Sequence, residues 1–293
     1  MPLLRWIPRM MLALGLLATR GSTQTIDTDG PIASAWERPM VLGAHRGGKD
    51  EWPENTVVAF REAAAAYPDI LLEGDLQLSR DGAVVVIHDK TVDRTTEGTG
   101  AVKDLSLTEL KALDAGYRFT PDGGQTFPWR GKGVTIPTLE EVLSAAPRHR
   151  FLLELKDGDG LTEKAIPILR AHGGEERIII ASFQPELMAA LRAQWPGVAT
   201  CYDQPRAFAL LTALRQGDWA GYTPTDRMLS LPKRYVKQLS ITKAEIAKIQ
   251  QKGILVQVHT LNAAGEITQY RALGVDSILT DRPALLATLL HND

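Results

Sequence analysis

The chain has 293 residues, of which 44% are hydrophobic and 23% charged, and this ordinary globular composition excludes intrinsically disordered proteins and multi-helix membrane bundles. Its 33 Lys and Arg against 35 Asp and Glu give a net charge of −2, and no basic run forms a stripe that could follow a nucleic-acid backbone. The single cysteine, Cys201, excludes an intramolecular disulfide and a thiolate metal site.

The first 30 residues have the layout of a secretory signal peptide. Arg5 and Arg9 precede an apolar run from Met10 to Ala18, and the polar stretch GSTQTIDTDG follows. The run is too short for a stable anchor, which needs about 20 residues. We therefore expect residues 1–30 to be a signal peptide and flexible N-terminus, and the mature protein to be periplasmic or secreted without a stable membrane anchor.

From residue 37 to residue 291, short β-rich runs alternate with helical patterns, which is typical of a parallel sheet with crossover helices. Apolar residues at helical spacing predict the helices. The repetition predicts one (β/α)8 TIM-like barrel. The expected strands are 40–44, 70–75, 83–89, 151–156, 177–182, 198–203, 254–260, 276–281 and a weaker one at 219–222; the expected helices are 54–67, 106–113, 138–146, 161–172, 185–195, 205–216, 243–252, 264–273 and 283–290.

The connection between the second and third expected strands is irregular. Between Asp75 and Ala83 the chain has only LQLSRDG, too short for a helical crossover of at least about ten residues. We expect the chain to run back in extended form, turn at Asp81-Gly82 and climb again as the third strand. The strand list is also one too long for eight, and either this short return or the 219–222 segment explains the surplus.

An excursion rich in Gly and Pro follows the third strand, at about 114–137. Its position places it at the end of the barrel where such enzymes hold their active sites. Two interpretations stay open, a cover over the substrate and a surface loop without function.

Ionisable side chains stand at the C-terminal ends of four expected strands, which in a (β/α) barrel open into one mouth. Three are carboxylates: Glu73 and Asp75 lie two apart on one strand and so face the same side, and Glu154 can approach them from another. Their mutual repulsion requires either protonation or a cation, and oxygen ligands favour a hard divalent ion, Ca²⁺ or Mg²⁺.

Two histidines and two cations complete this set. His45 and His88 end two different strands and could serve as base and acid in phosphodiester cleavage, or be structural histidines. Arg46 could clamp a phosphate and Lys156 could balance developing negative charge, or both could pair with the carboxylates.

Taken together, the motifs resemble the glycerophosphodiester phosphodiesterase family from about Val41 to Pro283, which is nearly all of the expected mature chain. In order they are GAHRGG, PENT, LEGDLQLSRDG, VVIHD, DRTTEGTG, IPTLEEVL, LELK, ASF, HTLN and GVDSILTDRP. The resemblance implies a phospholipase C-like phosphodiesterase barrel that hydrolyses glycerophosphodiesters to glycerol 3-phosphate and an alcohol.

The same resemblance implies roles residue by residue. His45 and His88 would be general acid and base, and Glu73, Asp75 and Glu154 would bind one divalent cation, Ca²⁺ or Mg²⁺. Arg46 and Lys156 would hold the phosphate of a small-molecule substrate.

Three further residues are candidates for substrate contact at the mouth. Asn55, in the ENT motif with Glu54, could orient substrate or metal-bound water, or cap a helix. Phe183 could contact glycerol or a head group, or pack in the core or in a lid. His259 stands where many family members carry an aromatic residue, so it either alters recognition of the alcohol or fills the aromatic's space.

Alternative functions stay open from the sequence. A lysophospholipase D or sphingomyelinase D-like enzyme would need an acyl-chain groove, which no long apolar stretch near the mouth suggests. A bacterial phosphatidylinositol-specific phospholipase C lacks the complete three-carboxylate set. A catalytically silent binding barrel would be expected to lack a histidine or metal ligand, and none is missing here. The oligomeric state is not predicted.

Overall fold

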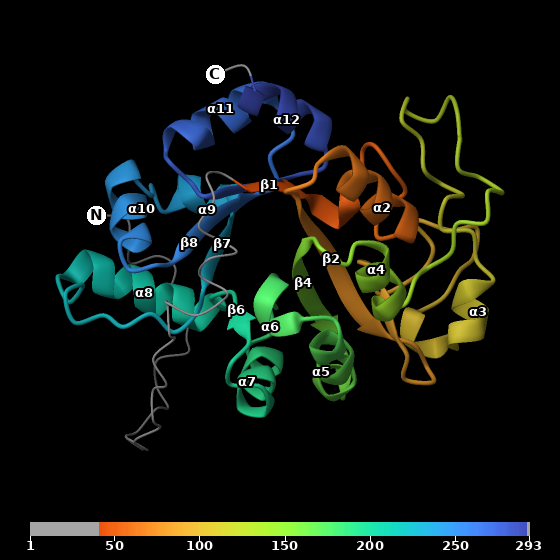
Figure 1. Ribbon diagram of the computed structural model, residues 1–293, viewed down its shortest axis with the longest axis horizontal. Coiled ribbons are helices and arrows are strands. Elements are labelled where there is room, and N and C mark those ends of the chain that lie inside the picture. The colour runs from red at the N-terminus through yellow and green to blue at the C-terminus, as the bar shows by residue number, and fades with distance from the viewer. Residues whose placement is uncertain (1–40, 292–293) are drawn as a thin grey trace.

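Eight parallel strands surround a common axis, with the helices outside them, in the computed structural model of the chain (Figure 1). The structure describes residues 41–291, so the expected signal peptide at 1–30 lies outside this range. The predicted (β/α)8 barrel is confirmed. Around the barrel the order is β6 (Ala199–Thr200), β5 (Ile178–Ala181), β4 (Arg150–Asp157), β2 (Leu71–Leu78), β1 (Val41–Ala44), β9 (Ser277–Thr280), β8 (Leu255–His259) and β7 (Met228–Pro232).

The barrel closes between β6 and β7 through a short seam. Cys201 and Met228 form a single parallel bridge, and the backbone N–H of Tyr202 donates to the Met228 carbonyl at 2.9 Å. The barrel is therefore nearly closed rather than fully paired.

The predicted helices are present, with ends that shift by a few residues. Three of them begin with the Ser/Thr-x-x-Glu capping box, as at Ser106 and Glu109, in which side chain and backbone groups satisfy each other. The nine are α2 (Val57–Ala66), α3 (Leu107–Lys111), α4 (Leu139–Ala145), α5 (Leu161–Ala171), α7 (Pro185–Gln194), α8 (Gln204–Gln216), α10 (Lys243–Gln250), α11 (Ala264–Ala272) and α12 (Pro283–His291). Short segments not predicted are η1 (His45–Gly47), η2 (Val102–Asp104), α6 (Gly174–Arg177) and α9 (Lys233–Gln238).

The expected strand at 219–222 is wrong. Those residues form a turn in which the rings of Trp219 and Tyr222 stack with centroids 5.1 Å apart. The barrel strand is β7, which pairs with β8 from Met228 to Pro232. Its sequence, MLSLP, reads poorly as a strand because Pro232 cannot donate a backbone hydrogen bond and Ser230 interrupts the apolar run.

The irregular connection after β2 is a hairpin. β2 continues beyond Leu72, its last residue paired with β1, and β3 (Val84–Val86) returns antiparallel to it, with Leu78 opposite Val84 and Leu76 opposite Val86. The expected order of an extended return followed by a climbing third strand is therefore wrong, because β3 is itself the return. β3 is also the surplus strand, since it lies off the barrel path.

The inside of the barrel changes from apolar to polar towards the mouth. Leu71, Leu152 and Met228 belong to an apolar cluster inside the wall. Side chains alternate along a strand, so the next inward positions are two residues further on, and there the barrel has Glu73, Glu154 and Ser230. The core thus ends beneath a layer of polar side chains.

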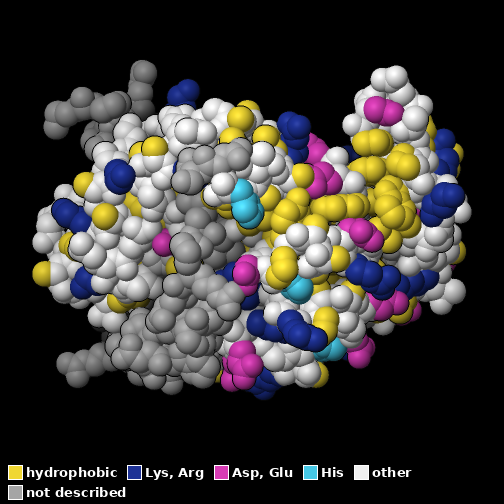
Figure 2. All heavy atoms as spheres, turned by 45° about the horizontal axis from the view of Figure 1, so that its top comes forward, with side chains coloured by type: hydrophobic (Ala, Val, Ile, Leu, Met, Phe, Trp, Pro, Cys, Tyr) yellow, Lys and Arg dark blue, Asp and Glu magenta, His cyan; other side chains and the backbone are white. Residues whose placement is uncertain are grey.

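The excursion at 114–137 contains neither helix nor strand and rises beside β3. Ala115, Val134 and Ile136, near its two ends, pack in one cluster with Val85 and Ile87. Figure 2 shows it as a projecting lobe at the upper right, with hydrophobic side chains along it. Within residues 41–291, no helix is both long and apolar enough to cross a bilayer.

Candidate active site

Three carboxylates meet at the mouth, as predicted. Glu73, Asp75 and Glu154 each offer an oxygen, and these oxygens lie within 4.8 Å of one another. Burial, reinforced by the charge of Asp75, raises the pKa of Glu73, and burial also raises the pKa of Glu154 against the lowering effect of Lys156. Three carboxylates that repel one another and offer only oxygen ligands fit a hard divalent cation.

Arg46 and Lys156 both lie against this cluster. The Lys156 Nζ is 3.0 Å from Glu154 Oε1 and 3.5 Å from Asp75 Oδ1. The Arg46 Nη1 donates to Glu54 Oε1 at 3.0 Å, but its buried Nε has no hydrogen-bond partner among the described residues. That Nε faces the Asp75 carboxylate, 3.7 Å from its Oδ2, so the guanidinium offsets part of the negative charge of the cluster.

Two site residues have a left-handed backbone, which is uncommon for residues other than glycine. Arg46 has φ 54° and its backbone N–H donates to Glu73 Oε2 at 2.7 Å. Asn55 has φ 56° and its amide Nδ2 donates to Asp75 Oδ2 at 2.9 Å. Such conformations cost about 1–3 kcal/mol and concentrate at functional sites.

Asn55 does not cap the following helix. The N-cap of α2 is Thr56, whose hydroxyl accepts from the backbone N–H of Ala59 at 3.2 Å. The capping interpretation of Asn55 is therefore wrong, and its amide instead fixes one carboxylate of the acidic cluster.

His45 is oriented by a buried carboxylate from the neighbouring strand end. Its Nδ1 lies 2.5 Å from Asp281 Oδ1, and Asp281 also binds Lys49 and Asn262. Burial alone would raise the pKa of Asp281, but the hydrogen bond and charge of His45, the charge of Lys49 and the hydrogen bond of Asn262 lower it to about 2. An ionised Asp281 only accepts, so Nδ1 carries the proton and Nε2 is free for chemistry.

His88 reaches the mouth because β3 descends towards it. The backbone N–H of Ile87 donates to the Asp75 carbonyl at 2.9 Å. The buried Gln77 Nε2 lies within hydrogen-bond distance of the carbonyls of Ile87, His88 and Asp89, at 2.9, 3.0 and 2.6 Å. The sequence placed His88 correctly but for the wrong reason, since it does not end a climbing barrel strand.

The His88 ring is held by a chain of exposed ion pairs. Its Nδ1 lies 2.7 Å from Asp89 Oδ1, and Arg94 binds both Asp89 and Glu54, the latter at 2.6 and 2.7 Å. The hydrogen bond from Arg94 is the main cause that lowers the pKa of Asp89 to about 2, and burial lowers the pKa of His88.

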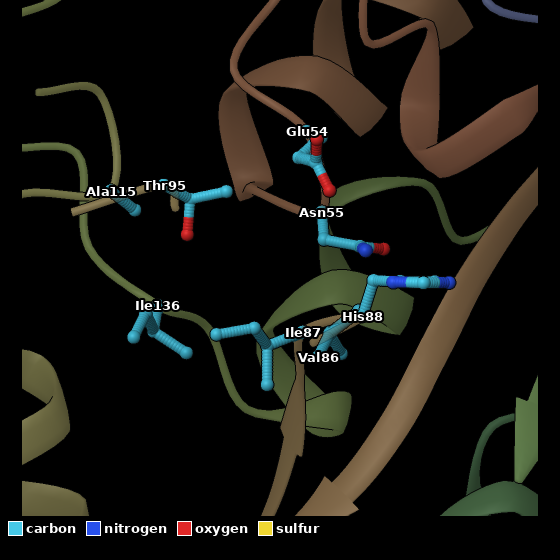
Figure 3. Close-up of a pocket in the computed structure, with 8 residues that line it drawn as sticks. All are labelled: Glu54, Asn55, Val86, Ile87, His88, Thr95, Ala115 and Ile136. Carbon is cyan, nitrogen blue, oxygen red and sulfur yellow. The ribbon is translucent and has the colours of Figure 1, made fainter. Parts of the chain in front are cut away.

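A small cavity of about 10 Å³ lies beside His88, between β3 and the ends of the excursion (Figure 3). Asn55 and His88 extend in the same direction in this view, away from Ile87 and Ile136. The excursion is thus attached next to a candidate catalytic side chain.

Phe183 and His259 lie at the ends of β5 and β8. Phe183 is 61% exposed, so the core-packing interpretation is wrong. His259 is partly buried, and its Nδ1 lies 3.0 Å from Ser230 Oγ. Burial, together with the neighbouring His45, lowers the pKa of His259 to about 4.

Sequence reasoning missed the residues that support the histidines: Asp89, Asp281, Gln77 and Arg94. Asp89 and Asp281 stand inside the VVIHD and LTDRP motifs, directly after strand-like runs. An acidic residue at a strand end could have been read as a histidine partner.

Comparisons with known proteins agree with these motifs. The family model of the glycerophosphoryl diester phosphodiesterase family matches residues 45–285. A glycerophosphodiester phosphodiesterase of Caldanaerobacter subterraneus is 34% identical over 85% of this chain and 96% of that protein. Among solved structures, a glycerophosphodiester phosphodiesterase from Agrobacterium tumefaciens is 26% identical, with a TM-score of 0.69 over 85% of this chain and 99% of that one. An Oleispira antarctica phosphodiesterase in complex with the product sn-glycerol-3-phosphate is 25% identical, with a TM-score of 0.69 over 88% of this chain and 99% of that one.

Proposed function

Because the chain belongs to the glycerophosphoryl diester phosphodiesterase family, we propose that its barrel mouth hydrolyses glycerophosphodiesters to glycerol 3-phosphate and an alcohol with the help of one divalent cation. The observation that carries the proposal is the acidic cluster, whose three oxygens lie within 4.8 Å of one another next to Arg46 and Lys156. The product complex of the Oleispira phosphodiesterase supports the choice of product.

Glu73, Asp75 and Glu154 are the proposed ligands of Ca²⁺ or Mg²⁺. When bound, the cation would polarise the phosphoryl oxygens and offset the negative charge of the displacement. Arg46 and Lys156 hold the phosphate, Arg46 through its guanidinium charge beside Asp75 and Lys156 as a compact charge. Asn55 keeps Asp75 in place by donating to its Oδ2.

His45 and His88 are the proposed proton carriers. Each has its Nδ1 held by a carboxylate, so each presents Nε2 for proton transfer. One removes the proton from the attacking hydroxyl or water, and the other gives a proton to the departing alkoxide. Phe183 and His259, at two other strand ends, contact the alcohol portions of the substrate.

One assay tests this function. The protein without residues 1–30 is incubated with glycerophosphocholine, and glycerol 3-phosphate is measured with and without a chelator. We expect turnover that the chelator abolishes and that Ca²⁺ or Mg²⁺ restores. Full activity in the chelator would remove the cation from the proposal, and cleavage of lysophosphatidylcholine alone would replace it with a lysophospholipase D.

Export to the periplasm or the medium is a further proposal, supported by the arginines and the apolar run between Arg5 and Ala18. N-terminal sequencing of the mature protein from its native host should begin downstream of Ala18. A mature protein that begins at Met1 would contradict it.

A further inference from the structure

His259 ends a row of polar side chains that crosses three barrel strands. Ser230 on β7 lies in register with Gln257 on β8, which lies in register with Ser277 on β9. Gln257 is fully buried and His259 follows it two residues later, so both face the barrel interior and His259 is nearer the mouth. The row therefore links the interior of the barrel to the substrate side.

With the Gln257 amide oriented as it is in the structure, a count of protons along this row assigns the hydrogen to one nitrogen of His259. The Gln257 Nε2 donates to Ser277 Oγ at 3.0 Å, and its Oε1 accepts from Ser230 Oγ at 2.7 Å. That bond uses the only proton of the Ser230 hydroxyl. At 3.0 Å from His259 Nδ1, Ser230 Oγ can therefore only accept, and Nδ1 must donate.

The remaining nitrogen, Nε2, is then a bare acceptor. The lowered pKa of His259, about 4, keeps the ring neutral near pH 7, since burial and the nearby His45 and Arg234 disfavour the charged form. No donor to Nε2 is found among residues 41–291. Water can donate to this acceptor in the free protein, and a bound substrate that displaces the water must donate in its place to keep the bond. Ionised phosphate oxygens only accept, so such a donor would be a hydroxyl.

We propose that His259 is a specificity-determining residue, whose Nε2 accepts a hydrogen bond from a free hydroxyl of an alcohol esterified to the phosphate, such as glycerol, and so contributes to the preference for hydroxyalkyl over simple alkyl phosphodiesters. This inference rests on the proposed function and assigns part of its substrate selection to one residue. A phenyl ring at position 259 could pack against the same carbons but could not accept a conventional hydrogen bond, so the histidine adds selection by polarity to selection by shape.

Two matched substrates test this selection: the p-nitrophenyl phosphodiesters of glycerol and of propanol. The measured quantity is the ratio of kcat/KM for the glycerol diester to that for the propyl diester. We expect His259→Phe to lower this ratio about tenfold, the worth of one neutral hydrogen bond. His259→Gln should retain most of the ratio, because its amide oxygen can accept near the position of Nε2. His172→Phe, at the C-cap of α5, is the matched control and should leave the ratio unchanged.

The outcomes separate the two proposals. A wild-type protein that cleaves neither diester would overturn the proposed function, and this inference with it. A wild-type protein that cleaves both, with an unchanged ratio or an equal loss on both substrates in His259→Phe, would overturn the inference alone.

A second measurement does not depend on activity. In ¹⁵N-labelled protein near pH 7, the His259 resonances, assigned by their absence in His259→Gln, should show a protonated Nδ1 and an unprotonated Nε2. A protonated Nε2 would contradict the proposal.

Discussion

The two histidines of the site have the same kind of partner but very different supports. The side chains of His45 and Asp281 are 16% and 5% exposed, and they follow two strands, β1 and β9, that pair within the barrel wall. Those of His88 and Asp89 are 31% and 30% exposed, and they follow a strand outside the wall. The barrel thus fixes one imidazole through buried structure, whereas a hairpin and surface ion pairs fix the other.

The sharpest way to extend this comparison is to ask which histidine is the acid. His45→Ala and His88→Ala should each lower kcat on glycerophosphocholine by about 10³-fold, the usual worth of a positioned acid or base. A p-nitrophenolate leaving group needs no proton, so on the p-nitrophenyl diester of glycerol one variant should recover most of its loss. That variant lacks the acid. Recovery in both or in neither would contradict a division of roles.

Removing the more buried of the two supporting carboxylates should cause the larger loss of kcat. Asp281→Asn should lower kcat about 100-fold, because no solvent can replace the buried acceptor, and Asp89→Asn only about tenfold. KM should change little in either variant, and the pH profile of kcat should shift, since both residues act through an imidazole. A larger loss in Asp89→Asn would reverse the comparison.

A smaller effect is expected on stability. The pKa of Asp281 falls from its usual 3.8 to about 2 on folding, so the ionised group stabilises the folded state above about pH 4, and this contribution disappears as the pH falls towards 2. The shift corresponds to about 2 kcal/mol.

Urea unfolding of wild type and Asp281→Asn should therefore differ by about 2 kcal/mol at pH 7, and the difference should shrink below about pH 4 and vanish as the pH reaches about 2. Asp89→Asn should show a smaller gap at pH 7, since solvent screens its more exposed pairs. A gap for Asp281→Asn that did not change with pH would mean that packing, and not charge, stabilises the wild type.

The sequence predicted the barrel and the acidic cluster because both depend on local patterns. Glu73 and Asp75 lie two apart on one strand and Glu154 lies on another, and any parallel barrel brings such positions to one mouth. The path of β3 was not predictable in the same way, because VVVIHD reads identically whether the strand climbs or descends. The contact of His45 with Asp281 joins residues 236 positions apart, so no local pattern identifies it.

The strand at Met228–Pro232 was not predicted from the sequence, for a related reason. Its inward Ser230 looks unsuited to a barrel core until Gln257 and Ser277 are known to lie beside it and to complete its hydrogen bonds. Buried polar residues on neighbouring strands are stable because they hydrogen-bond to one another. Since these partners are spread over about 50 residues of the sequence, only the fold reveals them.

Gln77 anchors the backbone of Ile87, His88 and Asp89 through their carbonyls, so the position of His88 does not depend on the chain that follows. The excursion at 114–137 begins only after this anchor, and its tip at Gly123 and Gly124 is exposed. That segment could therefore be lengthened, shortened or exchanged for another loop while the imidazole stays where it is. The tip is therefore a place where the chain can be altered without rebuilding the reaction centre.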